Sequence, residues 1–591
     1  MTSRCLAALM AWLCLAGSAL AAERATEISL IPWPASLEVT GGTLTVEPST
    51  QIVVDGDASV RAIALYFGDL VERARGWRPV IVQGTVQDAP KRSVVFALGG
   101  GGQAPEGYTL DVSSKGAVVT APDVRGLFNG AVTLWQLLTM STMDTREARI
   151  PAVRIVDAPR LRWRGLLLDS ARQYQSVAFI KRYIDFMALH KLNVLHWRLV
   201  DDRAWRLQIP KYPKLTGGMS SYTADDVREV IAHAAARNVM VVPGLEMPGG
   251  ATPAVTAYPM LRAADTPAVG SNLYNIDEET FVFFDAVFAH VTSLFPSEYV
   301  HIGAADISKD QWKQSSNVQA RMRELGIINE QKVQRYFFER IGELTQKYKR
   351  RIVGWDAVFS GGVPQDTVIM TGKGLDGALG AVASGYEVIV SSHAALSFNL
   401  AQSATANDQA KAGDILSLGD VYRFDPAPSA LSSQDLSRLV GVQGNVWTTP
   451  DDNEANVESL TFPRAAALAE IGWTAPKYLR WAEFQPRMVA MLGRYSRMGV
   501  RFSDEAFRAM AYKRGESGDK VAVELAKQVP LGEIRYTLNG SEPNAKSQVY
   551  TDVFQVPRVA TIKAAVFYNG EQLSRTTSVN VATDIIGGTA Q

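Results

Sequence analysis

Charged and aromatic side chains stand where several apolar, strand-like segments of the chain end. One such segment ends at Asp169, with Arg172 three residues later, and a second ends at Asp201 and Asp202. Others carry, at or near their ends, His301, Trp355 and Trp447. Aromatic rings stack on the C–H faces of sugar rings, and carboxylate and guanidinium groups hydrogen-bond sugar hydroxyls. If these ends meet, the sequence predicts a sugar-binding mouth.

Each of these residues also has a purely structural interpretation. Arg172 and Asp169 could form an ion pair that only supports the fold, and a tryptophan at a strand end often covers a core. Histidines on buried strands, such as His196 and His301, are more often core residues than ligands. The sequence contains no Gly-x-Ser-x-Gly segment, the pattern that would indicate a serine nucleophile. Spacing alone therefore predicts a polar, aromatic mouth and no particular reaction.

The elements that must position these residues alternate between strand and helix. Strand-like segments cover 165–169, 194–200, 240–245, 299–302, 352–355, 368–371, 388–391 and 440–447. Helical segments separate most of them, at 177–190, 224–237, 279–294, 332–348, 375–384 and 460–471. Eight strands in this alternation favour a (β/α)8 barrel, whose functional side chains lie at the carboxyl ends of the strands. A doubly wound sheet is the alternative.

The barrel is expected to span residues 158–505, with a different kind of domain on each side. Residues 27–157 combine short strands with two amphipathic helices and predict an α+β domain. Residues 516–591 contain strands that run into Asn539-Gly540 and Asn569-Gly570. Asn-Gly is a typical hairpin turn, so a small antiparallel β-sandwich is predicted there.

Residues 1–21 have the pattern of a secretory signal peptide. Arg4 precedes an apolar run, which ends in the small-residue triplet Ala19-Leu20-Ala21. The run is too short to span a membrane. Both cysteines, Cys5 and Cys14, lie in it, so no disulfide is expected after cleavage. The sequence predicts export to the periplasm or the extracellular space.

Composition narrows the possible partners. The 60 Lys and Arg residues balance 60 Asp and Glu residues, which gives no electrostatic footprint for nucleic acid or anionic membrane. No later segment has the length of a transmembrane helix. The six histidines lack metal-ligand spacing, so neither a metal nor a cofactor is expected. The expected partner is a glycan or small saccharide, and the oligomeric state stays open.

Several ordered motifs resemble glycoside hydrolase family 20, the β-N-acetylhexosaminidases. They are 164–172, 191–197, Asp201-Asp202, Trp205-Arg206, 212–215, 247–249, 301–303, 353–356, 462–464 and 472–474. The opening Ile31-Pro32-Trp33-Pro34 is similar to the family's N-terminal α+β domain, and residues 536–543 to the C-terminal sandwich of chitobiase-type members. The resemblance implies retaining hydrolysis of terminal N-acetylhexosamine-type glycans, with the sugar's acetamido oxygen as nucleophile.

The resemblance also implies an Asp-Glu pair after strand four, which this chain lacks. Ala305 stands at the position of the Asp that orients the acetamido group, and Asp306 at that of the Glu that acts as general acid. Other family positions have changed to Gly244, Gly250, Gly372, Ser397, Asn399 and Thr449. The matching binding positions are Arg172, Asp201, His301, Trp355 and Trp447.

Three functions follow as expectations. The first is a family member that binds such glycans but has lost most or all hydrolysis. The second is a working β-N-acetylhexosaminidase that uses Asp306 as its acid. The third is a glycosidase adapted to a sugar without the acetamido group, for which the loss of the residues that hold this group would be expected.

Overall fold

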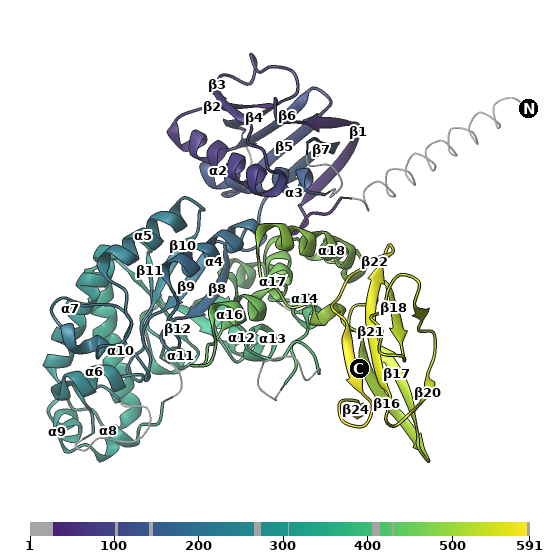
Figure 1. Ribbon diagram of the computed structural model, residues 1–591. Helices are drawn as coiled ribbons and strands as arrows, with labels where there is room; N and C mark the ends of the chain where they lie inside the picture. The colour runs from purple at the N-terminus through teal and green to yellow at the C-terminus, as the bar shows by residue number, and fades with distance from the viewer. Residues whose placement is uncertain are drawn as a thin grey trace, which may run out of the picture. The chain divides into compact units, whose positions relative to one another are not determined.

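The computed structural model describes residues 28–100, 104–140, 146–264, 273–304, 307–404, 414–427 and 431–587. These residues form two compact units (Figure 1). One is the continuous segment Leu161–Leu468, and the other combines the chain up to Arg160 with the chain from Ala469 onward. The predicted signal peptide lies outside the described residues.

The segment Leu161–Leu468 contains a closed parallel barrel, as predicted. Its strands are β8 (Trp163–Asp169), β9 (Val194–Arg198), β10 (Met240–Gly244), β11 (Tyr299–His301), β12 (Arg351–Trp355), β13 (Val368–Thr371), β14 (Glu387–Val390) and β15 (Leu439–Val446). Each strand pairs with the next, and β15 closes the barrel against β8. Nearly every strand residue is buried, because helices cover the outside of a parallel barrel.

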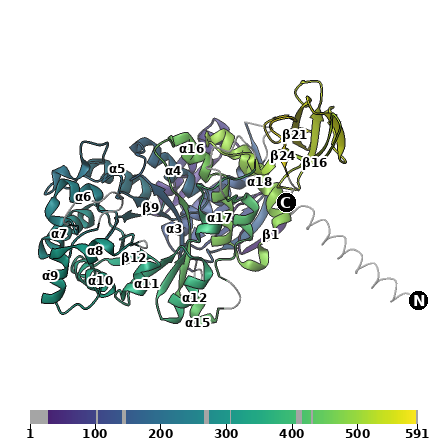
Figure 2. The same cartoon turned by 90° about the horizontal axis from the view of Figure 1, so that it is seen from below.

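Helices follow the strands and surround them (Figure 2). They include α4 (Val177–Leu189), α5 (Ala224–Ala235), α7 (Glu278–Leu294), α10 (Glu330–Lys347), α12 (Leu375–Ala383), α16 (Glu454–Thr461) and α17 (Arg464–Trp473). The single helix predicted at 460–471 is wrong, because the chain leaves α16 at Phe462 and begins α17 at Arg464. Pro463 lies between them, and a proline inside a helix removes a backbone donor and clashes with the preceding turn.

Large side chains from all eight strands fill the barrel interior. Trp163 and Leu167 of β8 pack there with residues of the other strands, including Val242, Val353, Met370, Ile389 and Val440. The β15 strand lies close to β8 at Gly441, which pairs with Trp163. A Cβ atom on Gly441 would lie 1.9 Å from the carbonyl oxygen of Trp163. Closure of the barrel therefore depends on the missing side chain.

The N-terminal part of the other unit is an α+β layer. Its seven-stranded sheet has the order β1-β7-β5-β6-β4-β2-β3. The strands are β1 (Ser36–Val46), β2 (Gln51–Asp55), β3 (Val80–Gln83), β4 (Ser93–Leu98), β5 (Tyr108–Ser113), β6 (Gly116–Ala121) and β7 (Ala148–Asp157). Helices α2 (Ala58–Arg75) and α3 (Val124–Leu138) pack on the sheet and on each other (Figure 1).

Helix α18 (Trp481–Met498) joins this layer to the end of α17. Arg494 of α18 donates to the carbonyl oxygens of Gln136 (2.9 Å) and Ser29 (2.8 Å). Arg487, on the same helix, forms a buried ion pair with Glu470 of α17, at 2.5 Å. Two arginines of one helix thus hold together segments that are far apart in the sequence.

The chain ends in two facing sheets that share one core. The first has the order β20-β17-β16-β24, and the second contains β19, β18, β21, β22 and β23. Their bounds are β16 (Met510–Ser517), β17 (Lys520–Ala526), β18 (Glu533–Thr537), β19 (Gln548–Val549), β20 (Phe554–Pro557), β21 (Thr561–Tyr568), β22 (Glu571–Gln572), β23 (Thr577–Asn580) and β24 (Ile586–Gly587). Val523 of β17 and Ile562 of β21 lie in one core cluster, which confirms the predicted sandwich.

The Asn569-Gly570 turn lies where the sequence predicts a hairpin. Both residues have positive φ, 52° and 81°, as a two-residue hairpin turn requires. The predicted fold class is confirmed. The domain limits proposed from the sequence stay a prediction. Among the described residues, no helix combines the length and the apolar character needed to cross a bilayer.

Substitution of Gly441 by alanine tests the closure of the barrel. Because the new Cβ would collide with the backbone of β8, we expect a loss of about 3 kcal/mol or more in unfolding free energy. Gly380→Ala in α12 is the matched control, because no atom lies within 4 Å of the added Cβ; it should gain about 0.5–1 kcal/mol from helix propensity. Denaturant unfolding measures both, and equal effects would contradict this account of closure.

Candidate functional site

Asp169 and Arg172 lie at the carboxyl end of β8, where the chain turns toward α4. The backbone N–H of Arg172 donates to Asp169 Oδ1 at 3.1 Å, which fixes the turn. The Asp169 side chain is fully buried, whereas 36% of the Arg172 side chain is exposed. Thr448, after β15, donates from Oγ1 to the Asp169 carbonyl oxygen at 2.7 Å. The turn therefore holds Arg172 at the mouth of the barrel.

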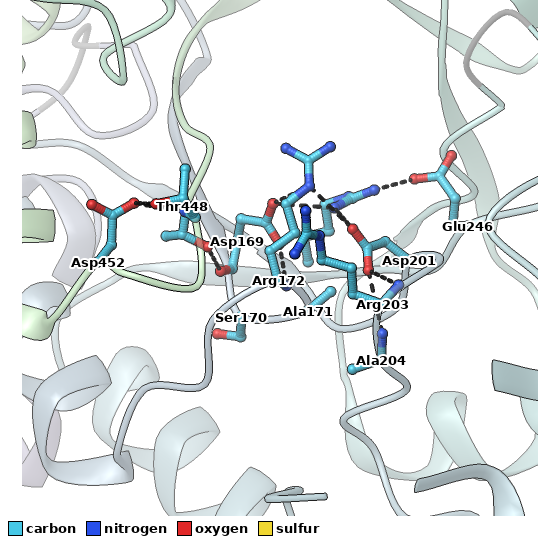
Figure 3. A network of polar contacts seen from close by, with 12 residues as sticks. Asp169, Ser170, Ala171, Arg172, Asp201, Arg203, Ala204, Glu246, Thr448 and Asp452 are labelled. Atoms are coloured by element: carbon cyan, nitrogen blue, oxygen red, sulfur yellow. Dashed lines mark hydrogen bonds and ion pairs between the residues drawn. The ribbon is translucent and has the colours of Figure 1, made fainter. Parts of the chain in front are cut away.

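Arg198, the last residue of β9, joins three carboxylates. Its Nη1 lies 3.1 Å from both Asp169 Oδ2 and Asp201 Oδ2, and its Nη2 lies 3.0 Å from Glu246 Oε2. The acids come from β8 and from the segments after β9 and β10, and they converge as Figure 3 shows. We call Asp169, Arg172, Arg198, Asp201 and Glu246 the ion network.

Burial and the arginines act in opposite directions on these acids. Burial raises the pKa of Asp169 and of Glu246, and the positive charge of Arg198 offsets only part of this shift. Burial would also raise the pKa of Asp201, but Arg198, the Arg203 N–H and Arg172 outweigh it and lower that pKa. Burial would lower the pKa of Arg198, and the carboxylates outweigh it and raise that pKa. Asp201 is thus held ionised.

Arg172 keeps the outer end of its guanidinium group available. Its Nε lies 3.1 Å from Asp201 Oδ2 and 3.5 Å from Asp169 Oδ2. Neither terminal nitrogen has a hydrogen-bond partner among the described residues. The group lies over the ring of Trp447, 5.4 Å from its centroid. Two donors therefore remain above an aromatic surface.

Aromatic rings form the floor beside Arg172. The ring of Trp447 lies 5.8 Å from that of Trp355, at an interplanar angle of 45°. Trp355 also contacts His301 edge to face, at 5.2 Å, and the exposed ring of His393, at 6.0 Å. A Cβ atom on Gly372 would lie 2.5 Å from His393 Nε2. The His393 ring thus occupies the space beside Gly372.

His196 and His301 pack against each other next to this floor, with their rings tilted by 31°. Their ring centroids lie 4.1 Å apart, and both rings are buried. Burial and nearby Arg198 lower the pKa of His301 to about 3; burial, His301 and Arg198 lower that of His196. Both rings are therefore neutral at ordinary pH. In each ring, Nε2 has no hydrogen-bond partner among the residues that the structure describes.

The structure brings the five predicted binding residues into one chain of contacts. It runs from Asp201 through Arg172 to Trp447, and on through Trp355 to His301. Their roles stay predictions. Ala305 and Asp306 lie outside the described residues. Within those residues, no group of three His, Cys, Asp or Glu side chains is arranged to hold a metal ion.

The expected binding residues did not include three residues of the site: Arg198 and Glu246, which stand at strand ends in the sequence, and His393. Alternation along a strand could have found Arg198, because residues two apart face the same side and His196 faces the interior. No comparable signal marks His393, which reaches Trp355 from the segment after another strand, β14.

Replacement of Arg198 by methionine tests the ion network. The change leaves buried carboxylates without their shared cation, so we expect a loss of about 3–5 kcal/mol in unfolding free energy at neutral pH. The loss should shrink as the pH falls and the carboxylates take up protons. Arg203→Met, at an exposed arginine nearby, is the control and should change stability little. An equal loss in both variants, or a loss independent of pH, would contradict the network.

Comparison with known proteins agrees with this geometry. The profile "Glycosyl hydrolase family 20, catalytic domain" matches residues 161–476, and "Glycosyl hydrolase family 20, domain 2" matches residues 27–158. The profile "Chitobiase/beta-hexosaminidase C-terminal domain" matches residues 513–578. The three matches follow the barrel, the α+β layer and the terminal sandwich.

Individual relatives extend the likeness over most of the chain. A beta-hexosaminidase of Porphyromonas gingivalis is 28% identical over 94% of this chain and 74% of its own. The GH20 exo beta-N-acetylglucosaminidase of Vibrio harveyi, solved with N-acetylglucosamine, has a TM-score of 0.75 and 25% identity, covering 81% of this chain and 78% of that one. An aspartate-to-alanine mutant of the Streptomyces plicatus beta-hexosaminidase, solved with the product GlcNAc, has a TM-score of 0.70 and 26% identity, covering 81% and 96%. The chain therefore belongs to glycoside hydrolase family 20, the family of the β-N-acetylhexosaminidases.

Proposed function

We propose that this protein binds the terminal sugar of a hexosamine-type glycan, and that its hydrolytic activity is lost or strongly weakened. The observation that carries the proposal is the pair of unpartnered Arg172 donors above the ring of Trp447. A guanidinium fork matches two neighbouring hydroxyl groups, and the indole face matches the C–H surface of the sugar ring. Trp355 extends that surface.

The weak hydrolysis follows from the sequence after β11. Ala305 offers a methyl group, which cannot accept a hydrogen bond from the acetamido N–H or balance a developing positive charge. Loss of such a charge-stabilising group costs about 10²–10³ in rate. Asp306 is one methylene shorter than a glutamate, and misplacement of a reacting group by about 1 Å costs roughly a further hundredfold.

Two of the described acids at the mouth, Asp169 and Asp201, offer little compensation. A general acid must hold a proton and reach the leaving oxygen. Asp169 is fully buried beneath Arg172, and Asp201 is held ionised by two arginines. The Streptomyces plicatus mutant, in which one aspartate is replaced by alanine, holds the product GlcNAc, which supports binding of a sugar in the absence of an aspartate.

An altered sugar specificity is the second candidate function. It is favoured by His393, whose ring fills the space beside Gly372, where the resemblance implies a tryptophan that encloses the acetamido group. An active β-N-acetylhexosaminidase that uses Asp306 as acid is the third. A panel of aryl glycosides separates the three, because only the active candidates release the aryl group.

We call the Arg172 guanidinium group and the Trp447 ring together the aromatic clamp. Calorimetric measurement of the affinity for a series of tetrasaccharides tests it. Trp447→Ala should weaken binding about tenfold or more, because it removes the stacking surface and the support of Arg172. Trp481→Ala, on α18 in the other unit, is the matched control and should leave the affinity unchanged. Binding that survives Trp447→Ala would refute the proposed clamp.

Restoration of the family pair tests how far hydrolysis has been lost. We expect the double variant Ala305→Asp with Asp306→Glu to remain without appreciable aryl-glycoside turnover. Gly372, Ser397 and Thr449 still lack the side chains that the family uses to hold the sugar. Release of the aryl group at rates like those of an active relative assayed in parallel would show that only these two positions had silenced the enzyme.

A further inference from the structure

We propose that the sugar bound at this mouth carries a free amine, whose ammonium group binds the carboxylate of Glu246. This inference rests on the proposed function, since both place a hexosamine above Trp447. It narrows the ligand to 2-amino sugars that are not acetylated. Four features of the site support it: the position of Glu246, its unpaired oxygen, the charges that surround it and the missing acetamido enclosure.

Glu246 sits in a space that two glycines keep open. A Cβ atom on Gly303, after β11, would lie 2.0 Å from Glu246 Oε1. A Cβ atom on Gly250 would lie 2.3 Å from Glu246 Cγ. Any side chain at either position would therefore displace the glutamate. These glycines place its carboxyl group against the end of β11, the strand that in the family carries the catalytic acids.

One oxygen of Glu246 is available to a ligand. Oε2 accepts from Arg198 Nη2 at 3.0 Å, whereas Oε1 has no hydrogen-bond partner among the described residues. Only 9% of the residue's surface is exposed. An ionised carboxylate accepts several hydrogen bonds, and a buried one that lacks them is costly. Figure 3 shows the carboxyl group at the edge of the ion network.

The charges around Glu246 do not balance. The ion network contains three carboxylates, Asp169, Asp201 and Glu246, but only two cations, Arg172 and Arg198. Arg206 adds a positive charge that acts on Asp169 and Asp201, and Asp202 adds a negative charge that acts on Glu246, so four acids face three arginines. The two histidines next to the floor are neutral and supply no compensation.

The excess charge can be removed in two ways. Either Glu246 takes up a proton, which its raised pKa favours, or a cationic group of the ligand approaches Oε1. An ammonium group donates up to three hydrogen bonds and carries the missing charge. A neutral acetamido N–H supplies one donor and no charge. The site therefore favours the amine.

The other side of the mouth lacks the side chains that, by the family resemblance, would hold an acetamido group. Gly372 has no side chain, and His393 occupies the space beside it. Ser397 replaces the phenol that the resemblance implies for the acetamido carbonyl, and Ala305 replaces the acid for its N–H. An unacetylated amine requires none of these groups.

The test compares three tetrasaccharides by calorimetry on the full chain: fully deacetylated chitosan tetramer, its N-acetylated counterpart and cellotetraose. We expect the amine to bind about tenfold or more tightly than either neutral sugar, as a charge-assisted hydrogen bond in a buried site would give. Glu246→Gln keeps the shape of the side chain and should reduce this preference to within about twofold. Glu229→Gln, at a half-exposed glutamate of α5, is the control and should preserve the preference.

The pH dependence gives a second readout. As the pH falls, protonation of Glu246 should weaken binding of the amine in the native protein, whereas Glu246→Gln should show no such change. A preference for the acetylated sugar that Glu246→Gln leaves intact would overturn this inference and leave the proposed function standing. Failure of all three sugars to bind would overturn both. Aryl-glycoside turnover that Glu246→Gln abolishes would make Glu246 an acid and would also overturn the inference.

Discussion

The attraction between Arg198 and three carboxylates is the constraint on which the mouth of this barrel depends. A guanidinium group at the end of β9 lies within 3.1 Å of acids carried by three consecutive strand ends. Such a group is stable inside a protein only if its partners are already in place. The arrangement therefore fixes the turn after β8, the segment after β9 and the segment after β10 relative to one another, and Arg172 and Trp447 take their positions from it.

The network also decides which chemistry the mouth can perform. Arg198 and Arg172 hold Asp201 in the ionised form, which suits recognition of hydroxyl and ammonium groups and opposes proton donation by that residue. In the function that we propose, the chain keeps the features that bind a sugar ring and lacks those that polarise the glycosidic bond. Binding and catalysis would be separable because they depend on different strand ends: Arg172 and Trp447 follow β8 and β15, and the catalytic pair is expected after β11.

The sequence predicts the architecture well for a physical reason. Buried parallel strands and amphipathic helices leave a periodic pattern of apolar residues, and the barrel follows from their alternation. The prediction of one helix across 460–471 was wrong, because it followed the apolar pattern of this segment and gave too little weight to Pro463. Arg172, Asp201, His301, Trp355 and Trp447 could be predicted because they match motifs at strand ends. Strand alternation could have placed Arg198 on the inner face of β9, but its partners, like the neighbours of His393, come from separate strands that only the fold brings together.

The division of the chain has a consequence for its synthesis. Asp157, at the end of β7, accepts from Trp473 Nε1 at 3.0 Å, and the N–H of Arg160 donates to the Trp473 carbonyl oxygen at 2.8 Å. The N-terminal layer likewise receives Arg494 from α18. These partners leave the ribosome only after the entire barrel has been translated. The first domain to emerge is thus the last to acquire its full set of contacts, and nascent chains that stop within the barrel would expose the surface that α17 and α18 normally cover.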